Sequence, residues 1–443
     1  STSTYCYISY TLLTNSVGTG NIAVGRGALR YNVASSNVAV GTRALYCNTT
    51  GTGVAVGLSA LFNNTTGTQN TAIGNRSLYA NIGGSDNTAV GFQSLLCNTG
   101  GGNSAFGRNA AICNTTGVAN TAVGAQSLNY NTVGANNVAV GYRSLFCNTA
   151  SNNTALGALS LCLNTASNNT AIGSAALRVN TIGAGNTAVG FNTLSVNSVG
   201  GSNTAIGINA LQANTVGNYN TAVGRNALFC NISALNNTAI GYSSLFANTT
   251  GGNNVAVGYQ SLLCNRVSNN TAVGFCALRS NTTGAQQVAM GQKALGLNTT
   301  GIRNVAIGAY SLFNNLTTNG NTAVGYGTLY KNTANNNTAL GYNSLRNNTT
   351  GTDNVAVGRL TLSNNTVGAS NVAIGGLSLL NNTSGATNTA IGASTLRYNT
   401  VGTNNIAVGL NALFCNTTGN CNFAELAFMG YLMLINIMYH RSE

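Results

Sequence analysis

Residues 321–351 read NTAVGYGTLYKNTANNNTALGYNSLRNNTTG, and this stretch contains nearly the same phrase twice. The phrase recurs along most of the 443-residue chain. When each copy is numbered from its first residue, usually Asn, as position 0, 24 copies begin between Asn21 and Asn405, at seven steps of 16 residues and sixteen steps of 17. One copy of so short a repeat cannot bury its own apolar side chains, whereas stacked copies can. The sequence therefore predicts a solenoid.

Several positions of the repeat are nearly invariant. Position 2 is Ala, position 4 is Gly and position 11 is Asn in all 24 copies. Position 8 is Leu except at Ala111, position 3 is always apolar, and position 7 is always Ala, Ser or Thr. The many Gly, Asn and Thr residues disfavour helices. We therefore predict two short strands in each coil, at positions 0–4 and 6–10. Gly at position 4 forms one corner, and the NTTG segment forms the other and absorbs the one-residue difference in length.

The predicted fold is an all-β parallel β-solenoid, or β-roll, of about 24–25 coils of 16–17 residues. Because neighbouring strands lie about 4.8 Å apart, 24 coils would form a rod of about 115 Å. Residues 1–20 are predicted to form an N-terminal partial coil or cap, residues 21–420 the rod, and residues 421–443 an apolar C-terminal cap or assembly tail.

The invariant Asn at position 11 has a physical explanation in a stacked fold. Identical Asn side chains placed above one another form a ladder of amide hydrogen bonds. A different residue would leave its neighbours' amides unsatisfied. The predicted ladder includes Asn32, Asn48, Asn332 and Asn348.

The apolar columns predict which sides of the coil are buried. We expect Leu at position 8 and Val or Ile at position 3 to fill the interior. Position 2, on the other face of the strand, is never polar and never large, which is typical of a strand covered on both faces. The simplest cover is the same surface of a sister chain about a symmetry axis. The sequence therefore predicts a homotrimer whose contact face carries the Ala column, represented by Ala89, Ala122, Ala323 and Ala339.

The basic residues mark the predicted outer surface. The chain has 17 basic and 4 acidic residues, for a formal charge of +13. Thirteen of the basic residues occupy positions 5, 6 or 9, where Tyr and Phe also gather. The candidate outer binding surface consists of Arg76, Arg143, Arg178, Arg225 and Arg397. Such columns can attract an anionic polysaccharide or a nucleic acid, but the charge is spread thinly, so nucleic acid is the less expected partner.

Catalysis has few candidate residues in this chain. The one His is His440, and the acids Asp86, Asp353, Glu425 and Glu443 are far apart in the sequence. General acid–base catalysis needs titratable groups close together, and calcium-binding solenoid repeats carry an Asp in each turn. We therefore expect no enzyme activity, no cofactor and no metal.

Seven of the 11 Cys residues occupy position 10, in a column that also holds Ala, Leu, Val, Tyr and Asn. We interpret them as small, mostly buried apolar residues. Cys97 and Cys113 fall on adjacent coils, so their expected separation permits a disulfide. The irregular set does not match a zinc site or a disulfide framework.

The repeat decays from Cys421 onward, and residues 424–439 are apolar apart from Glu425 and Asn436. No segment of the chain reaches the roughly 18 apolar residues of a membrane span. We expect a cap that closes the trimer or a junction to another molecule; the alternatives are a membrane- or receptor-binding tip and a disordered tail. The candidate assembly residues are Phe428, Met429, Tyr431, Leu432 and Met433.

The phrases NVAVGYRSLFCNT (137–149) and NNTTGTDNVAVGRLTL (347–362) resemble the Gly-, Asn- and Ala-rich repeats of phage and giant-virus tail-fibre-like proteins. They are also similar to the head repeats of trimeric bacterial autotransporter adhesins, whose phrase is of the N-S-V-A-I-G type. The resemblance covers about residues 21–420. It implies a left-handed β-roll, three chains around one axis, binding through the outer surface and no catalytic residues. The chain differs in its longer repeat and in showing no coiled-coil stalk, membrane anchor or C-terminal chaperone-protease domain.

These features predict a non-enzymatic structural fibre or adhesin-like rod on a virion or cell surface, which presents a repetitive surface to an unknown receptor or glycan. The apolar tail would allow end-to-end polymerisation into extracellular filaments. The alternatives are an ice-binding solenoid and a basic solenoid that binds an anionic polysaccharide or a nucleic acid. Thr occupies position 1 in 13 coils and position 12 in 18. However, Val355 and Val372 interrupt the first Thr rank, and Arg266 and Leu316 interrupt the second.

Overall fold

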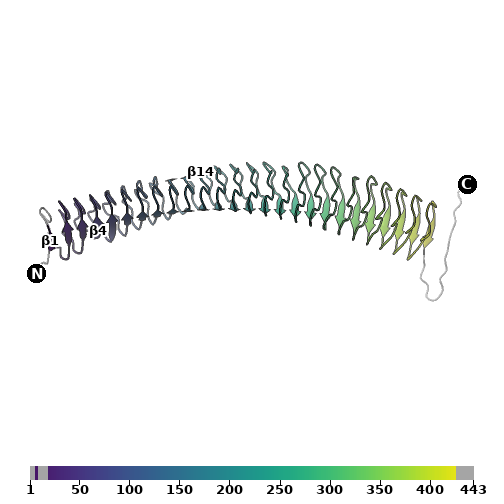
Figure 1. Cartoon of the computed structure of the whole chain (residues 1–443), viewed down its shortest axis with the longest axis horizontal. Coiled ribbons are helices and arrows are strands. Elements are labelled where there is room, and N and C mark those ends of the chain that lie inside the picture. The colour runs from purple at the N-terminus through teal and green to yellow at the C-terminus, as the bar shows by residue number, and fades with distance from the viewer. Residues whose placement is uncertain (1–4, 8–17, 426–443) are drawn as a thin grey trace, which may run out of the picture. The chain divides into compact units, whose positions relative to one another are not determined.

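The computed structural model of the chain describes residues 5–7 and 18–425. The chain divides into two compact units, residues 1–220 and 221–443. Within each unit, successive coils stack in chain order, with the strands side by side on one face and the connecting loops on the other (Figure 1). The described residues contain no helix. An all-β parallel β-solenoid of about 24 turns is thereby confirmed.

Most strands cover three or four residues of one repeat, mainly positions 1–3, and three strands cover the two residues at positions 10 and 11. In the first unit the strands are β1 (Tyr5–Tyr7), β2 (Ile22–Val24), β3 (Val38–Val40), β4 (Gly53–Val56), β5 (Asn70–Ile73), β6 (Thr88–Val90), β7 (Ser104–Phe106), β8 (Thr121–Val123), β9 (Val138–Val140), β11 (Thr154–Leu156), β13 (Thr170–Ile172), β15 (Thr187–Val189) and β16 (Thr204–Ile206), with the two-residue strands β10 (Cys147–Asn148), β12 (Leu163–Asn164) and β14 (Val179–Asn180). In the second unit they are β17 (Thr221–Val223), β18 (Thr238–Ile240), β19 (Val255–Val257), β20 (Thr271–Val273), β21 (Val288–Met290), β22 (Val305–Ile307), β23 (Thr322–Val324), β24 (Thr338–Leu340), β25 (Val355–Val357), β26 (Val372–Ile374), β27 (Thr389–Ile391), β28 (Ile406–Val408) and β29 (Phe423–Glu425).

The register places identical repeat positions above one another. In the pair β23–β24, Ala323 lies opposite Ala339, and the two strands run parallel. The same register continues beyond the predicted limits of the rod, because β1 pairs with β2 and β29 pairs with β28. Strand pairing therefore extends to Glu425, inside the segment that the sequence assigned to the tail.

The predicted second strand at positions 6–10 is wrong, because turns occupy most of this segment in both units. Leu at position 8 has a left-handed backbone, with a φ of 50° at Leu329 and 47° at Leu345, and position 6 is left-handed as well. A left-handed residue cannot continue an extended strand. This conformation is costly for Leu and persists where its surroundings fix it. Here the Leu side chain is buried, and the amide of Leu329 donates to the carbonyl of Ser344 in the next coil at 3.0 Å.

The invariant Gly at position 4 forms the first corner, as predicted. At Gly341, for example, φ is 129°, which is a conformation that side chains disfavour. A Cβ atom at Gly341 would lie only 2.4 Å from the carbonyl oxygen of Gly358 in the next coil. Both the backbone conformation and the close stacking therefore require glycine.

The Asn residues at position 11 form buried side-chain ladders within each unit. The Asn348 Nδ2 donates to Asn332 Oδ1 at 2.8 Å and to the carbonyl of Gly351 at 2.8 Å. Its Oδ1 accepts from Asn365 Nδ2 at 2.8 Å. In the first unit, Asn48 Nδ2 donates to Asn32 Oδ1 at 2.5 Å. The amide of Asn348 thus uses both its donors and its acceptor inside the stack. The ladder is interrupted at two described positions, where Asn81 Oδ1 and Asn248 Oδ1 are buried without a hydrogen-bond partner.

A second ladder runs through the Asn residues at position 0. The Oδ1 of Asn321 accepts the backbone amide of Asn337 at 2.9 Å, and Asn337 Nδ2 donates to the carbonyl of Gly351 at 2.9 Å. Gln287, one of the two exceptions at this position, keeps the pattern, because its Nε2 donates to the carbonyl of Gly301 and its backbone amide donates to Asn270 Oδ1. The longer amide side chain therefore substitutes for Asn.

The corner after position 11 absorbs the difference in coil length. In the 16-residue coil 321–336, Asn332 Nδ2 donates to the carbonyl two residues ahead, at Ala334. In the 17-residue coil 337–353, Asn348 donates three residues ahead, at Gly351. The ladder keeps its position, and the extra residue is accommodated in the turn.

The predicted orientation of the strand is also wrong. The Ala residues at position 2 are at most 1% exposed within the single chain, so Ala89, Ala122, Ala323 and Ala339 face the coil interior and do not form a contact face for another chain. Position 3 points outward instead, and Leu340 is 46% exposed. Successive strand residues alternate between faces, so positions 1 and 3 share one face. On its inner side each strand therefore presents only the methyl group of the Ala at position 2. The side chains at positions 7 and 8 of the same coil are also buried in this interior.

Replacing Asn348 by Ala should destabilise the second unit. The substitution removes three buried hydrogen bonds and leaves its partners partly unsatisfied, at about 1–3 kcal/mol for each unsatisfied group. Amide hydrogen exchange around coil 337–353 should therefore accelerate. The control is Asn347→Ala, which removes one exposed 3.4 Å hydrogen bond at position 10, where the chain already contains Ala80 and Ala247. Equal acceleration in both variants would argue against the ladder.

A second pair of variants tests the orientation of the strand. Ala323→Ile places a large side chain in a filled interior, and overpacking of this kind costs about 1–3 kcal/mol. Val324→Ile adds a methylene at an outward position where Ile already occurs in other repeats, so urea unfolding should hardly change. A stable, monomeric Ala323→Ile chain would contradict the inward placement of the Ala column.

Candidate binding surfaces

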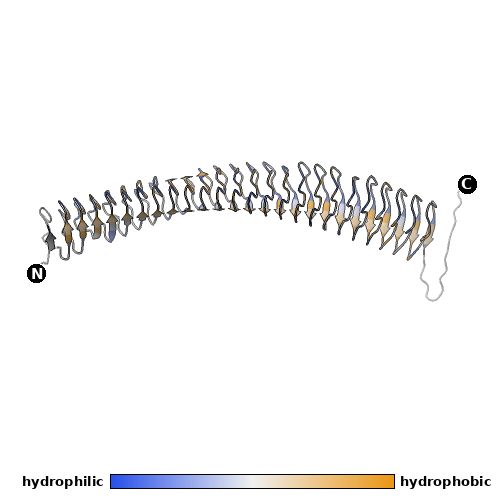
Figure 2. Ribbon diagram, viewed as in Figure 1, coloured by the Kyte–Doolittle hydropathy of each residue, from blue (hydrophilic) through white to orange (hydrophobic). Residues whose placement is uncertain are grey.

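The outer face of the strands carries no charge; position 3 is apolar in all 24 repeats, and position 1 is Thr or Ser in 14 of them. Positions 1 and 3 hold only Val, Ile, Leu, Met, Phe, Thr and Ser in the 24 repeats. Their side chains remain open to solvent in the single chain, as shown by exposures of 44% for Ile406, 42% for Met290 and 42% for Phe106. In Figure 2 the strands of the second unit carry much of the hydrophobic colour. Contiguous exposed apolar surface of this kind typically marks an interaction site.

Aromatic side chains stack along the edge formed by positions 5, 6 and 9. In the first unit, the ring centroids of Tyr46 and Phe62 are 5.0 Å apart, and those of Phe62 and Tyr79 are 5.1 Å apart. In the second unit, Tyr242 and Tyr259 stack at 5.3 Å. The coil spacing of about 4.8 Å is close to the distance at which rings stack, so equivalent aromatic residues on successive coils contact each other directly.

Arginine side chains lie over several of these rings. The Arg76 guanidinium is 5.5 Å from the Tyr79 centroid, and that of Arg143 is 5.0 Å from the Phe146 centroid. The Arg143 Nε also donates to Gln126 Oε1 at 2.8 Å. Such contacts hold a cation at the surface while leaving it accessible to a ligand.

The structure does not gather the five predicted arginines into one site. Arg76, Arg143 and Arg178 lie on different coils of the first unit, and Arg225 and Arg397 lie on different coils of the second. The side chains of Arg76, Arg178 and Arg225 are exposed. Within each unit the arginines are spread over separate coils at positions 5, 6 and 9, and such a distribution suits a long ligand better than a small molecule.

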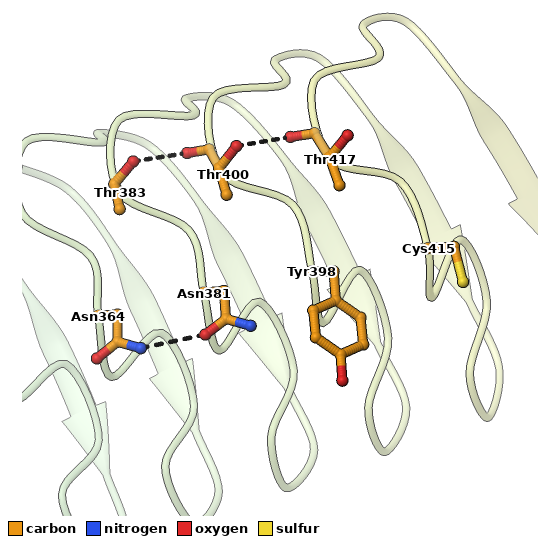
Figure 3. A pocket seen from close by; sticks show the side chains of 7 residues that line it. All are labelled: Asn364, Asn381, Thr383, Tyr398, Thr400, Cys415 and Thr417. Atoms are coloured by element: carbon orange, nitrogen blue, oxygen red, sulfur yellow. Dashed lines mark hydrogen bonds between the residues drawn. The ribbon is translucent and has the colours of Figure 1, made fainter.

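A shallow groove of about 660 Å³ lies on the loop side of the second unit (Figure 3). It runs between positions 10 and 12 of successive coils, and we call it the Asn–Thr groove. Its lining consists of Asn364, Asn381, Thr383, Tyr398, Thr400, Cys415 and Thr417. Sequence reasoning missed this groove, although the succession of three Asn at position 10, from Asn347 to Asn381, was a signal for it.

The Thr residues at position 12 use their hydroxyl groups within the stack. Thr349 Oγ1 donates to the carbonyl of Thr366 at 2.8 Å, and Thr366 Oγ1 donates to that of Thr383 at 3.0 Å. The hydroxyl hydrogens are therefore committed to the next coil. This second Thr rank offers mainly acceptor lone pairs to its surroundings.

The cysteines from Cys47 to Cys421 are free thiols. Burial raises the pKa of the Cys47 and Cys147 thiols, and burial together with the nearby Cys97 thiol raises the pKa of Cys113. Because the thiolate is the reactive form, these side chains stay protonated and unreactive near neutral pH. Within the described residues, no three His, Cys, Asp or Glu side chains come together as metal ligands.

No protein-family model matches this chain, and a search of curated proteins finds no match either. The likeness of its repeat to fibre and adhesin repeats therefore remains a prediction. Residues 5–7 and 18–425 include no helix of sufficient length and apolarity to cross a bilayer. The candidate assembly residues Phe428, Met429, Tyr431, Leu432 and Met433, and also His440, lie outside the described residues.

Proposed function

We propose that this protein is the non-enzymatic subunit of a structural fibre, an adhesin-like homotrimeric rod on a virion or cell surface. The observation that carries the proposal is the charge-free strand face, whose position 3 is apolar in every repeat and is half-buried or exposed in the single chain. An isolated soluble chain rarely leaves so much contiguous apolar surface in water.

Other copies of the same chain are the partners that fit this face best. The exposed side chains repeat at the coil spacing, so a parallel sister chain presents the same spacing along its whole length. Two side chains from each of 24 repeats offer far more area than the roughly 800 Å² that each partner buries in a standard interface. Closed symmetry covers the face on every copy, and we propose three chains with their strand faces inward.

Sedimentation equilibrium of the recombinant chain tests the assembly. The expected mass is three times 44.8 kDa. The double variant Val324→Lys/Leu340→Lys places charges on the proposed contact face and should lower the concentration range over which the trimer persists, because buried unpaired charges are costly. Its control is Tyr326→Lys/Tyr342→Lys, which adds the same charges to exposed side chains of the same coils at position 5.

The proposed trimer would be contradicted if the native chain sedimented as a monomer at every concentration. It would also be contradicted if the two double variants dissociated over the same concentration range. Electron micrographs of the trimer should also show rods, as a spacer function requires.

The edge formed by positions 5, 6 and 9, with its arginines and stacked rings, is called here the Arg–aromatic edge. It supports a second candidate function, the binding of an anionic polysaccharide along the outside of the fibre. Positions 5, 6 and 9 are separate from the proposed trimer face, so this edge stays open in the assembly. The exposed Arg76 and the half-buried Arg143, on separate coils of the first unit, provide charge attraction, and the rings beside them provide apolar contact area.

Binding to a sulfated polysaccharide such as heparin should weaken as salt rises, since counterions compete with charge-driven binding. Arg76→Gln/Arg143→Gln should reduce the affinity several-fold, and Gln already occurs at this position in Gln93 and Gln126. The control, Arg266→Gln/Arg303→Gln, removes two exposed charges at positions 12 and 16, away from the edge. An equal loss in the control would show that only net charge matters.

A further inference from the structure

We propose that the Asn–Thr groove is a binding site for a short stretch of an uncharged linear polysaccharide. The inference deepens the proposed role of the fibre by naming a ligand class for one part of its surface. The groove is built by a single chain at positions 10 and 12, so it does not depend on the trimer face at positions 1 and 3.

One side of the groove carries a line of amide groups. Asn347 Nδ2 donates to Asn364 Oδ1 at 3.4 Å, and Asn364 Nδ2 donates to Asn381 Oδ1 at 3.2 Å. The line ends at Asn381, whose Nδ2 points toward the next coil, where Tyr398 follows at the same position (Figure 3). No described side chain continues the line, so this amide has two N–H donors to offer a ligand.

The other side carries a rank of Thr side chains. Thr383 Oγ1 donates to the carbonyl of Thr400, and Thr400 Oγ1 donates to the carbonyl of Thr417, both at 3.0 Å (Figure 3). Their hydrogens are committed along the stack, and Figure 3 shows the Thr methyl groups directed toward the line of amides. Amide donors on one side and methyl groups on the other suit a sugar, which has polar hydroxyl groups and an apolar C–H face.

Tyr398 supplies an aromatic platform in the same row as the amides, directly after Asn381 (Figure 3). Its ring is 43% exposed and is held by an edge contact with Phe414, at 5.0 Å between centroids, and by the Arg397 guanidinium at 5.7 Å. An exposed ring with a polar hydroxyl tip matches a sugar ring, which has an apolar C–H face and a polar rim.

The lining of the groove contains no charged side chain, so charge does not select the ligand. The polar groups recur at the coil spacing of about 4.8 Å, which is comparable to the length of one sugar unit. A linear chain lying across the coils therefore meets an amide on two successive coils and the Tyr398 ring on the next, with a Thr opposite each. Only here do three successive repeats have Asn at position 10, followed by Tyr in the next repeat.

Isothermal titration of the full-length chain with linear six-residue oligosaccharides of β-1,4-linked glucose and of β-1,4-linked N-acetylglucosamine tests the proposal. At least one series should bind in a salt-independent manner. Tyr398→Ala and Asn381→Ala should each weaken that binding about tenfold or more. Ala already occurs at position 10 in Ala80 and Ala247, so both variants should fold.

Tyr130→Ala is the matched control. Tyr130 also occupies position 10, is 50% exposed and makes an edge contact with Phe146 at 5.1 Å, but the preceding residue of its column is Cys113 and not Asn. This variant should leave binding unchanged. An equal loss in Tyr130→Ala, or no binding of either series to the native chain at millimolar concentration, would overturn the proposal.

Cys415 gives a second readout that does not depend on the variants. Its exposed thiol lines the groove, whereas the exposed thiol of Cys421 does not. A saturating oligosaccharide should slow the alkylation of Cys415 several-fold and leave that of Cys421 unchanged; equal rates would count against the site. A monomeric chain that still binds the oligosaccharide would contradict the proposed trimer and support the proposed binding site. A trimer that does not bind it would support the trimer and contradict the binding site.

Discussion

The hydrogen bond between buried Asn side chains of successive coils is the constraint on which the rest of this structure depends. A primary amide has a donor and an acceptor, so identical residues can satisfy one another only if each lies directly above the last. Asn348, between Asn332 and Asn365, shows the arrangement. Because an unsatisfied buried amide is costly, the ladder fixes the register of the coils that it links, and length changes are confined to the corner that follows it.

Exact stacking turns each repeat position into a column with one environment. Gly at position 4 lies too close to the next coil for any side chain, as the Gly341–Gly358 contact shows. Position 2 faces a thin interior shared with the small residues of position 7 and the Leu of position 8. The Asn, Ala, Leu and Gly columns therefore reflect the internal packing of one chain, and the columns that face outward remain free to serve other partners.

The outward columns explain how such a chain can bind without a convergent site. Val324 and Leu340 belong to an uncharged face, Arg76 and Tyr79 belong to a basic aromatic edge, and Asn364 and Asn381 belong to the Asn–Thr groove. The first two surfaces extend over many coils, so their strength comes from repetition. The groove is local, because it needs a particular succession of residues at one position.

The sequence by itself determined the period, the parallel stack, the Asn ladders and the outward placement of the arginines, because a tandem repeat with invariant polar positions has few other ways to satisfy them. Only the tertiary structure decided which face of the strand is inside. It also replaced the expected second strand by turns, since the left-handed backbone of Leu329 and Leu345 is rare for Leu and is stabilised by contacts with neighbouring coils. The Asn–Thr groove could not be predicted from the sequence for the same reason. The side chains at positions 10 and 12 face the outside of the coil while the Asn at position 11 faces inward, and only the path of the folded loop sets these directions.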